Sequence, residues 1–67
     1  MKILLNGEPH EIPGRLSVAS LLTSLGIDPR RVAVEHNLAV VKRSAFDGAM
    51  IEDGDSIEIV NFVGGGA

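Results

Sequence analysis

The 67-residue sequence contains no cysteine, tryptophan or tyrosine, and nine acids outnumber its six lysines and arginines. The absence of cysteine excludes disulfides and thiolate chemistry, and it fits a reducing cytoplasm. The formal net charge of −3 argues against nucleic-acid binding, which needs clustered lysine and arginine. No apolar run approaches the roughly 20 residues of a membrane span, and the first residues lack the apolar segment of a signal peptide. We therefore expect one small, acidic, soluble domain in the cytoplasm, with no nucleic-acid or membrane partner.

The chain opens with the pattern of a β-hairpin. Residues 2–5 are mostly apolar and end at Asn6-Gly7, a strong hairpin signal because both residues tolerate positive φ. In the returning strand, residues 9–12, Pro9 restricts the segment to a sheet edge or a strand start. Pro13-Gly14 then suits a type II turn. We expect an antiparallel hairpin at the start of the fold.

A single helix is expected to follow the hairpin. Ser17 is a favourable N-cap residue. The apolar residues behind it fall at helical spacing: Val18, Leu21, Leu22 and Leu25. This stripe along about two turns indicates a face that packs into the core, not a cofactor site. Gly26 stands where a left-handed residue ends a helix, and Asp28-Pro29 prevents continuation.

The second half of the chain is expected to be mainly extended. The segments expected to be extended are residues 32–35, 38–41 and 56–63. Turns are indicated at Asn37 and at Asp53-Gly54, with a short helical turn around Phe46 between them. In the last segment Ile57 and Ile59 share one face. The residues of its other face are Glu58, Val60 and Phe62.

These elements predict an α+β fold in which a mixed sheet wraps over one helix. The last strand is the longest β-rich run, so we expect it in the middle of the sheet and parallel to the first strand. The side chains expected to face the helix are Ile3, Leu5, Val32, Val34, Ile57 and Ile59. The domain is expected to span residues 1–63, followed by a flexible tail at residues 64–67.

The tail contains three consecutive glycines, Gly64, Gly65 and Gly66, directly after the last strand. Three glycines gain nothing from packing and lose much backbone entropy on ordering. A tail without side chains on a rigid strand suits threading through a narrow channel, so that a terminal carboxylate reaches the active site of another protein. A frayed, inert terminus is the alternative, since chain ends are commonly disordered.

Three segments together resemble the ThiS family of ubiquitin-like sulfur carriers of thiamine biosynthesis: VAVEHN at 32–37, DGDSIEIV at 53–60 and FVGGG at 62–66. The resemblance covers essentially the whole chain. It implies a ubiquitin-like β-grasp fold, with a mixed four- to five-stranded sheet packed on one helix. It also implies that the protein is a co-substrate of other enzymes and not itself an enzyme.

In the family that the chain resembles, the carboxylate of a C-terminal glycine is adenylated with ATP by a partner, here a ThiF-like adenylating enzyme. The acyl-adenylate becomes a thiocarboxylate with sulfur from a donor system, and the sulfur passes to a ThiG-like thiazole synthase. The resemblance assigns the reactive carboxylate to Gly66. Ala67 departs from the family pattern, so we expect its removal before activation. Gly64 and Gly65 would thread the partner's channel.

An exposed apolar group beside the tail is expected to dock the partner enzymes: Val60, Phe62 and Val63. The chain itself has no glycine-rich loop between a strand and a helix with a lysine to hold phosphates. We therefore expect no bound cofactor, with ATP used by the partner enzyme only.

Other candidate sites are weak. His10 and His36 have no cysteine or paired carboxylates at metal-ligand spacing, so we interpret them as strand or surface residues. Asp53 and Asp55 imitate part of a calcium loop, but the remaining ligands are missing, and we interpret both as turn formers. No metal site and no catalytic residue is expected. Two alternatives stay open: a sulfur carrier for molybdopterin synthesis or tRNA thiolation, and an interaction module with an inert tail.

Overall fold

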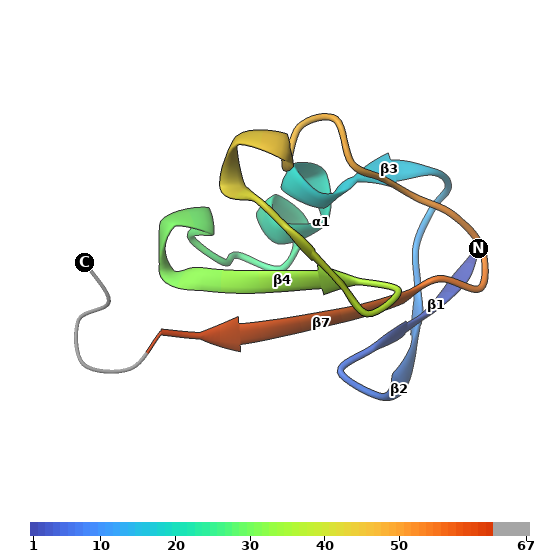
Figure 1. Cartoon of the computed structure of the whole chain (residues 1–67). Coiled ribbons are helices and arrows are strands. Elements are labelled where there is room, and N and C mark those ends of the chain that lie inside the picture. The colour runs from blue at the N-terminus through green and yellow to red at the C-terminus, as the bar shows by residue number, and fades with distance from the viewer. Residues whose placement is uncertain (63–67) are drawn as a thin grey trace.

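Five strands form one mixed sheet, and helix α1 packs against one of its faces (Figure 1). The computed structural model describes residues 1–62. Its elements are, in chain order, β1 (Lys2–Leu5), β2 (Glu8–Glu11), β3 (Leu16–Ser17), α1 (Val18–Ser24), the 3₁₀ turn η1 (Pro29–Arg31), β4 (Val32–His36), β5 (Ala39–Val41), the 3₁₀ turn η2 (Arg43–Ala45), β6 (Met50–Ile51) and β7 (Ser56–Asn61). Across residues 1–62, no helix combines the length and the apolar character needed to cross a membrane.

Strand β7 lies in the middle of the sheet, whose order is β2-β1-β7-β4-β5. It runs parallel to β1 and antiparallel to β4, while β2 and β5 each pair antiparallel at an edge. The predicted mixed sheet, its central last strand and its parallel pairing with the first strand are confirmed.

Two tight hairpins shape the sheet. In the first, Asn6 and Gly7 have φ of 51° and 83°, which is the two-residue turn that Asn-Gly predicts. In the second, Asn37 and Leu38 have φ of 51° and 72°. The prediction that Leu38 begins an extended segment is therefore wrong. The register pairs His36 with Ala39 across a two-residue turn, and the positive φ of both turn residues is that of a type I′ turn.

Helix α1 begins and ends as the sequence predicts. The Ser17 hydroxyl accepts a hydrogen bond from the backbone N–H of Ser20 at 3.0 Å. Gly26 has φ of 71°, its N–H donates to the carbonyl of Thr23, and the N–H of Ile27 donates to that of Leu22. These two bonds form a Schellman motif, which satisfies carbonyls that the helix end leaves open.

The core lies between α1 and the sheet, and its buried members are Ile3, Ile12, Val18, Leu21, Leu22, Val32, Val34, Phe46, Ile51 and Ile57. Of the predicted inward side chains, Leu5 and Ile59 are only partly buried. Phe46 and Ile51 come from the segment after β5, which contains η2 and β6. That segment is held by a small sheet of β3 and β6, which the sequence analysis missed.

Candidate functional site

The candidate site lies at the carboxyl end of β7, the point from which the glycine segment continues. Residues 57–61 of this strand pair with β4. One residue further, the N–H of Phe62 donates to the carbonyl of Arg31 at 2.9 Å. The backbone is therefore anchored on the β4 side up to the last residue that the structure describes.

Two apolar side chains at this end are solvent-exposed. Val60 retains 61% and Phe62 retains 49% of its accessible surface. Val60 stands opposite Ala33 in the register with β4, on the face away from α1. An exposed valine and phenylalanine beside each other are unfavourable in water unless a partner covers them. This geometry agrees with the predicted exposure of both residues, and their docking role stays a prediction.

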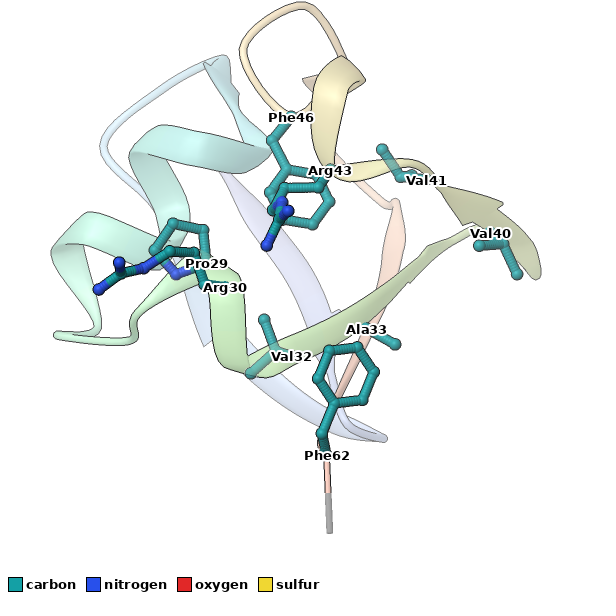
Figure 2. Close-up of a pocket in the computed structure, with 9 residues that line it drawn as sticks. All are labelled: Pro29, Arg30, Val32, Ala33, Val40, Val41, Arg43, Phe46 and Phe62. Atoms are coloured by element: carbon teal, nitrogen blue, oxygen red, sulfur yellow. The ribbon is translucent and has the colours of Figure 1, made fainter. Parts of the chain in front are cut away.

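A groove of about 350 Å³ opens beside Phe62 (Figure 2). Its lining residues are Pro29, Arg30, Val32, Ala33, Val40, Val41, Arg43, Phe46 and Phe62. They come from η1, β4, β5, η2 and the end of β7, so that no local stretch of sequence could have revealed the groove. Val32 and Phe46 belong to the buried core, whereas Val40 keeps 74% of its surface exposed.

The two arginines of the groove differ in their surroundings. Arg30 points away from the groove in Figure 2, and its Nε and Nη2 donate to the Asp28 carboxylate at 3.1 and 3.0 Å. The side-chain and backbone hydrogen bonds from Arg30 lower the pKa of Asp28 to about 2, and the charge of Arg31 adds to this. Arg43 points into the groove in Figure 2, and no carboxylate among residues 1–62 lies within ion-pair distance of it.

The other predicted residues of this site, Val63, Gly64, Gly65, Gly66 and Ala67, lie outside the described residues. Their roles therefore stay predictions. What the structure establishes is the base from which they continue: a hydrogen-bonded central strand with exposed apolar side chains at its end.

The opposite end of β7 holds a polar cluster around Asp55. The His36 ring Nε2 lies 2.7 Å from its Oδ2, the N–H of Glu52 donates to the same oxygen at 2.9 Å, and Asn37 Nδ2 donates to Oδ1 at 3.2 Å. Partial burial raises the pKa of Asp55, but the hydrogen bonds from His36, Glu52 and Asn37 outweigh it, so that the pKa is lowered overall.

The sequence analysis missed the contact between His36 and Asp55, because 19 residues separate them and only the pairing of β4 with β7 brings them together. Asp53 Oδ1 accepts the N–H of Lys2 at 2.9 Å. Both aspartates therefore act as turn residues, as predicted. His10 lies in β2 opposite Ile3. In the described part of the chain, no three side chains of metal-binding type gather to hold an ion.

Comparison with known proteins places these features in context. The model of the ThiS family matches residues 3–66. Thiazole synthase from Paramagnetospirillum magneticum is 45% identical over 67 residues, and thiazole synthase from Magnetococcus marinus is 47% identical over 66 residues. These matches cover 100% and 98% of this chain but only 21% and 20% of the two relatives, so the chain spans about a fifth of their length.

Among solved structures, the thiamine biosynthesis protein (ThiS) from Geobacter metallireducens is similar over its whole length. The TM-score is 0.87 at 39% sequence identity, with 98% of this chain and 100% of that chain covered. Together with the five-stranded sheet on one helix, this likeness confirms the predicted α+β, β-grasp fold.

Proposed function

The chain belongs to the ThiS family, and on this premise we propose that it is a sulfur carrier protein of thiamine biosynthesis. It serves other enzymes as a co-substrate and does not catalyse a reaction itself. The observation that carries the proposal is the family match over residues 3–66, which includes the glycines that follow β7. The similarity to a solved thiamine biosynthesis protein over almost the whole chain supports it.

The proposed chemistry takes place on the carboxylate of Gly66. A carboxylate is a poor electrophile, so a ThiF-like partner first joins it to AMP from ATP and releases pyrophosphate. Hydrosulfide supplied by a donor system then attacks the acyl carbon, the bond between that carbon and the phosphate oxygen breaks, and AMP leaves, which yields a thiocarboxylate. The chain has no cysteine, so that the sulfur arrives from outside and resides on the acyl carbon. Activation at this atom requires a chain that ends at Gly66, so Ala67 is removed first.

The fold supports this chemistry by fixing where the tail begins. Phe62 is held to Arg31 by a backbone hydrogen bond, so the position from which the glycines leave is determined. Val60, Phe62 and Val63 dock the adenylating enzyme, and Gly64 and Gly65 pass through its channel. Glycine suits both tasks, because the absence of a Cβ lets a partner's backbone approach closely.

The proposed sulfur acceptor is a ThiG-like thiazole synthase. Two relatives that carry a region similar to this chain are themselves thiazole synthases. Linking two modules in one polypeptide raises their effective concentration and favours modules that work together. This observation favours thiazole formation over molybdopterin synthesis or tRNA thiolation.

The test compares the full chain with a version that ends at Gly66. Each is incubated with the adenylating enzyme of the same genome, ATP and a sulfur source, and intact mass is measured. We expect the shorter version to gain the mass of sulfur in place of oxygen, and thiazole synthase to consume the product. If neither version is modified, the carrier function is wrong. If the full chain is modified at Ala67 as fast as the shorter one at Gly66, only the removal of Ala67 is wrong.

A further inference from the structure

Two turns of the sheet begin with an asparagine in the same conformation. Asn6 and Gly7 join β1 to β2 (Figure 1), and Asn37 and Leu38 join β4 to β5. The φ values are 51° and 83° in the first turn and 51° and 72° in the second. Positive φ at both central positions identifies each as a type I′ turn. The two turns therefore differ mainly in the residue that follows the asparagine, which is glycine in one and leucine in the other.

Both asparagine side chains fasten their turn to β7. Asn6 Oδ1 accepts a hydrogen bond from the backbone N–H of Ile59 at 2.8 Å, and the N–H of Asn6 donates to the carbonyl of Ile57 at 2.8 Å. Asn37 Oδ1 accepts from the N–H of Ser56 at 2.8 Å. The register of β1 with β7 ends at Ile57, so Asn6 supplies the acceptor that β1 does not offer to Ile59. The turn at Asn6 therefore supports the strand from which the glycine segment continues.

An asparagine that precedes a glycine is prone to a reaction of its own side chain. The Gly7 N–H gives its proton to hydroxide, and the nitrogen attacks Asn6 Cγ. The bond from Cγ to the side-chain nitrogen breaks, and this nitrogen takes a proton from water and leaves as ammonia, which closes a five-membered succinimide ring. Water then opens the ring at either carbonyl and yields aspartate or isoaspartate, whose main chain runs through the side-chain carbons. Glycine favours the attack because no side chain hinders its nitrogen, whereas Leu38 hinders the same attack on Asn37.

The type I′ turn holds Asn6 in a conformation that cannot close this ring. A planar five-membered ring needs Cβ and the following nitrogen to be eclipsed about the Cα–C bond. In a type I′ turn ψ of the first central residue is about +30°, which places these two atoms nearly opposite each other. Burial does not protect the site, because no atom of residues 1–62 lies within 4 Å of the position that a Cβ on Gly7 would take. The backbone conformation is therefore what opposes the reaction.

We propose that Asn6 is a deamidation site that the closed hairpin protects and that reacts when the hairpin opens. The aspartate product keeps a side-chain oxygen for the N–H of Ile59, so it refolds. Isoaspartate adds one carbon atom to the main chain of the turn, and a two-residue turn then no longer fits the register of Leu5 with Glu8. An opening of the first hairpin is thereby converted into a lasting loss of the fold. This reaction is independent of sulfur transfer.

The test incubates the full chain in mildly alkaline buffer with and without denaturing urea, and mass spectrometry of its peptides locates each amide that has become an acid. Conversion of Asn6 is expected to be at least about tenfold slower in the folded chain than in urea, because the reaction must wait for an opening. In urea, Asn37 is the matched control and is expected to react at least about tenfold more slowly than Asn6. Leu22→Ala opens more often, so without urea its Asn6 is expected to react faster than that of the parent.

A second measurement follows the two products, which have the same mass. An isoaspartyl methyltransferase with a labelled methyl donor marks isoaspartate only. After removal of the urea, size-exclusion chromatography separates folded from unfolded molecules. We expect isoaspartate in the unfolded fraction and aspartate in the folded one. Asn6→Asp is the control for the aspartate product and is expected to fold like the parent.

Three outcomes would contradict the proposal. If Asn6 reacts as fast in the folded chain as in urea, the turn does not protect it. If Asn37 or Asn61 reacts as fast as Asn6 in urea, the glycine does not single out Asn6. If molecules with isoaspartate refold as the parent does, the inferred loss of the fold is wrong.

Discussion

The two ends of strand β7 use their side chains in opposite ways. At its start, Asn37, Asp55 and Ser56 bond to one another and to neighbouring backbone groups, with donors matched to acceptors. At its end, Val60 and Phe62 are exposed to solvent beside a groove in which one arginine, Arg43, has no acidic partner in the described part of the chain. The hydrogen-bonded start of β7 contributes to the fold, and we expect the exposed side chains at its end to contact a partner.

The same strand can support both roles because it is central. Its hydrogen bonds to β1 hold the first half, and its pairing with β4 extends to the last residue. Leu38, in the turn beside the start of β7, is also exposed, at 84%. It lies in the turn between β4 and β5 and does not line the groove, so it provides a control for Phe62.

The largest effect on stability is expected in the hydrophobic core, on which both ends of β7 depend. Leu22 is fully buried between α1 and the sheet. Leu22→Ala should lower the free energy of unfolding by about 2–5 kcal/mol, measured by urea denaturation, because it leaves a cavity. In a domain this small the loss could unfold both ends together. A variant as stable as the parent would remove α1 from the core and contradict the fold.

The next largest effect is expected from Asp55→Asn at the start of β7. Asp55 Oδ2 receives both the Glu52 N–H and the His36 ring, while Oδ1 receives Asn37. An asparagine offers one acceptor oxygen, so at least one donor loses its partner. We expect a loss of about 1–3 kcal/mol at pH 7 by urea denaturation. Asp47→Asn, an exposed acid outside this cluster, should change stability by less than about 0.5 kcal/mol.

The pH dependence follows from the lowered pKa of Asp55. A group whose pKa is lower in the folded state stabilises the fold fully above its unfolded pKa, which is about 3.9 for aspartate. That contribution is lost as the pH falls through the folded pKa. The difference in stability between the parent and Asp55→Asn should therefore shrink below about pH 4. A difference that stays constant down to pH 2 would show that the charge of Asp55 contributes nothing.

The sequence predicts the features of the fold that depend on local signals: the first hairpin, the ends of α1 and the central last strand. Asn6-Gly7 forces the first hairpin, while Ser17 and Gly26 mark the two ends of α1. The length and apolar content of the last segment place it in the middle of the sheet. Each of these signals acts within a few residues, and this is why it can be recognised without a structure.

The remaining features depend on residues that only folding brings together. Strands β3 and β6 have two residues each, and their pairing links positions 16–17 with 50–51. The positive φ of Leu38 belongs to the type I′ turn between β4 and β5, and leucine is not a residue type that predicts such a turn. The groove collects side chains from five segments, so a single sequence gives no sign of it. Of the candidate site, only the exposure of Val60 and Phe62 could be predicted, from their alternation with Ile57 and Ile59.

A smaller effect on stability is expected at the end of β7. Phe62→Ala should cost at most about 1 kcal/mol in urea denaturation, because half of the ring is already in water. Its affinity for the adenylating enzyme should nevertheless fall by about tenfold, since a buried aromatic side chain commonly dominates an interface. Leu38→Ala should leave that affinity unchanged. Equal affinities of the two variants would mean that the end of β7 is no more a docking surface than its start.

The smallest effect is expected at the rim of the groove, where Asp28 binds Arg30 on the surface. The hydrogen bonds from Arg30 are the main cause of the low pKa of Asp28, about 2, and Arg31 adds a weaker attraction. Arg30→Gln should therefore raise the pKa of Asp28 toward the ordinary aspartate value of about 3.9, which NMR titration of the side-chain carboxyl measures. Lys42→Gln removes a charge near η2 instead and should leave this pKa in place. Should both variants shift it equally, the Asp28–Arg30 pair would not be specific, and Arg30 would be as available to a partner in the groove as Arg43.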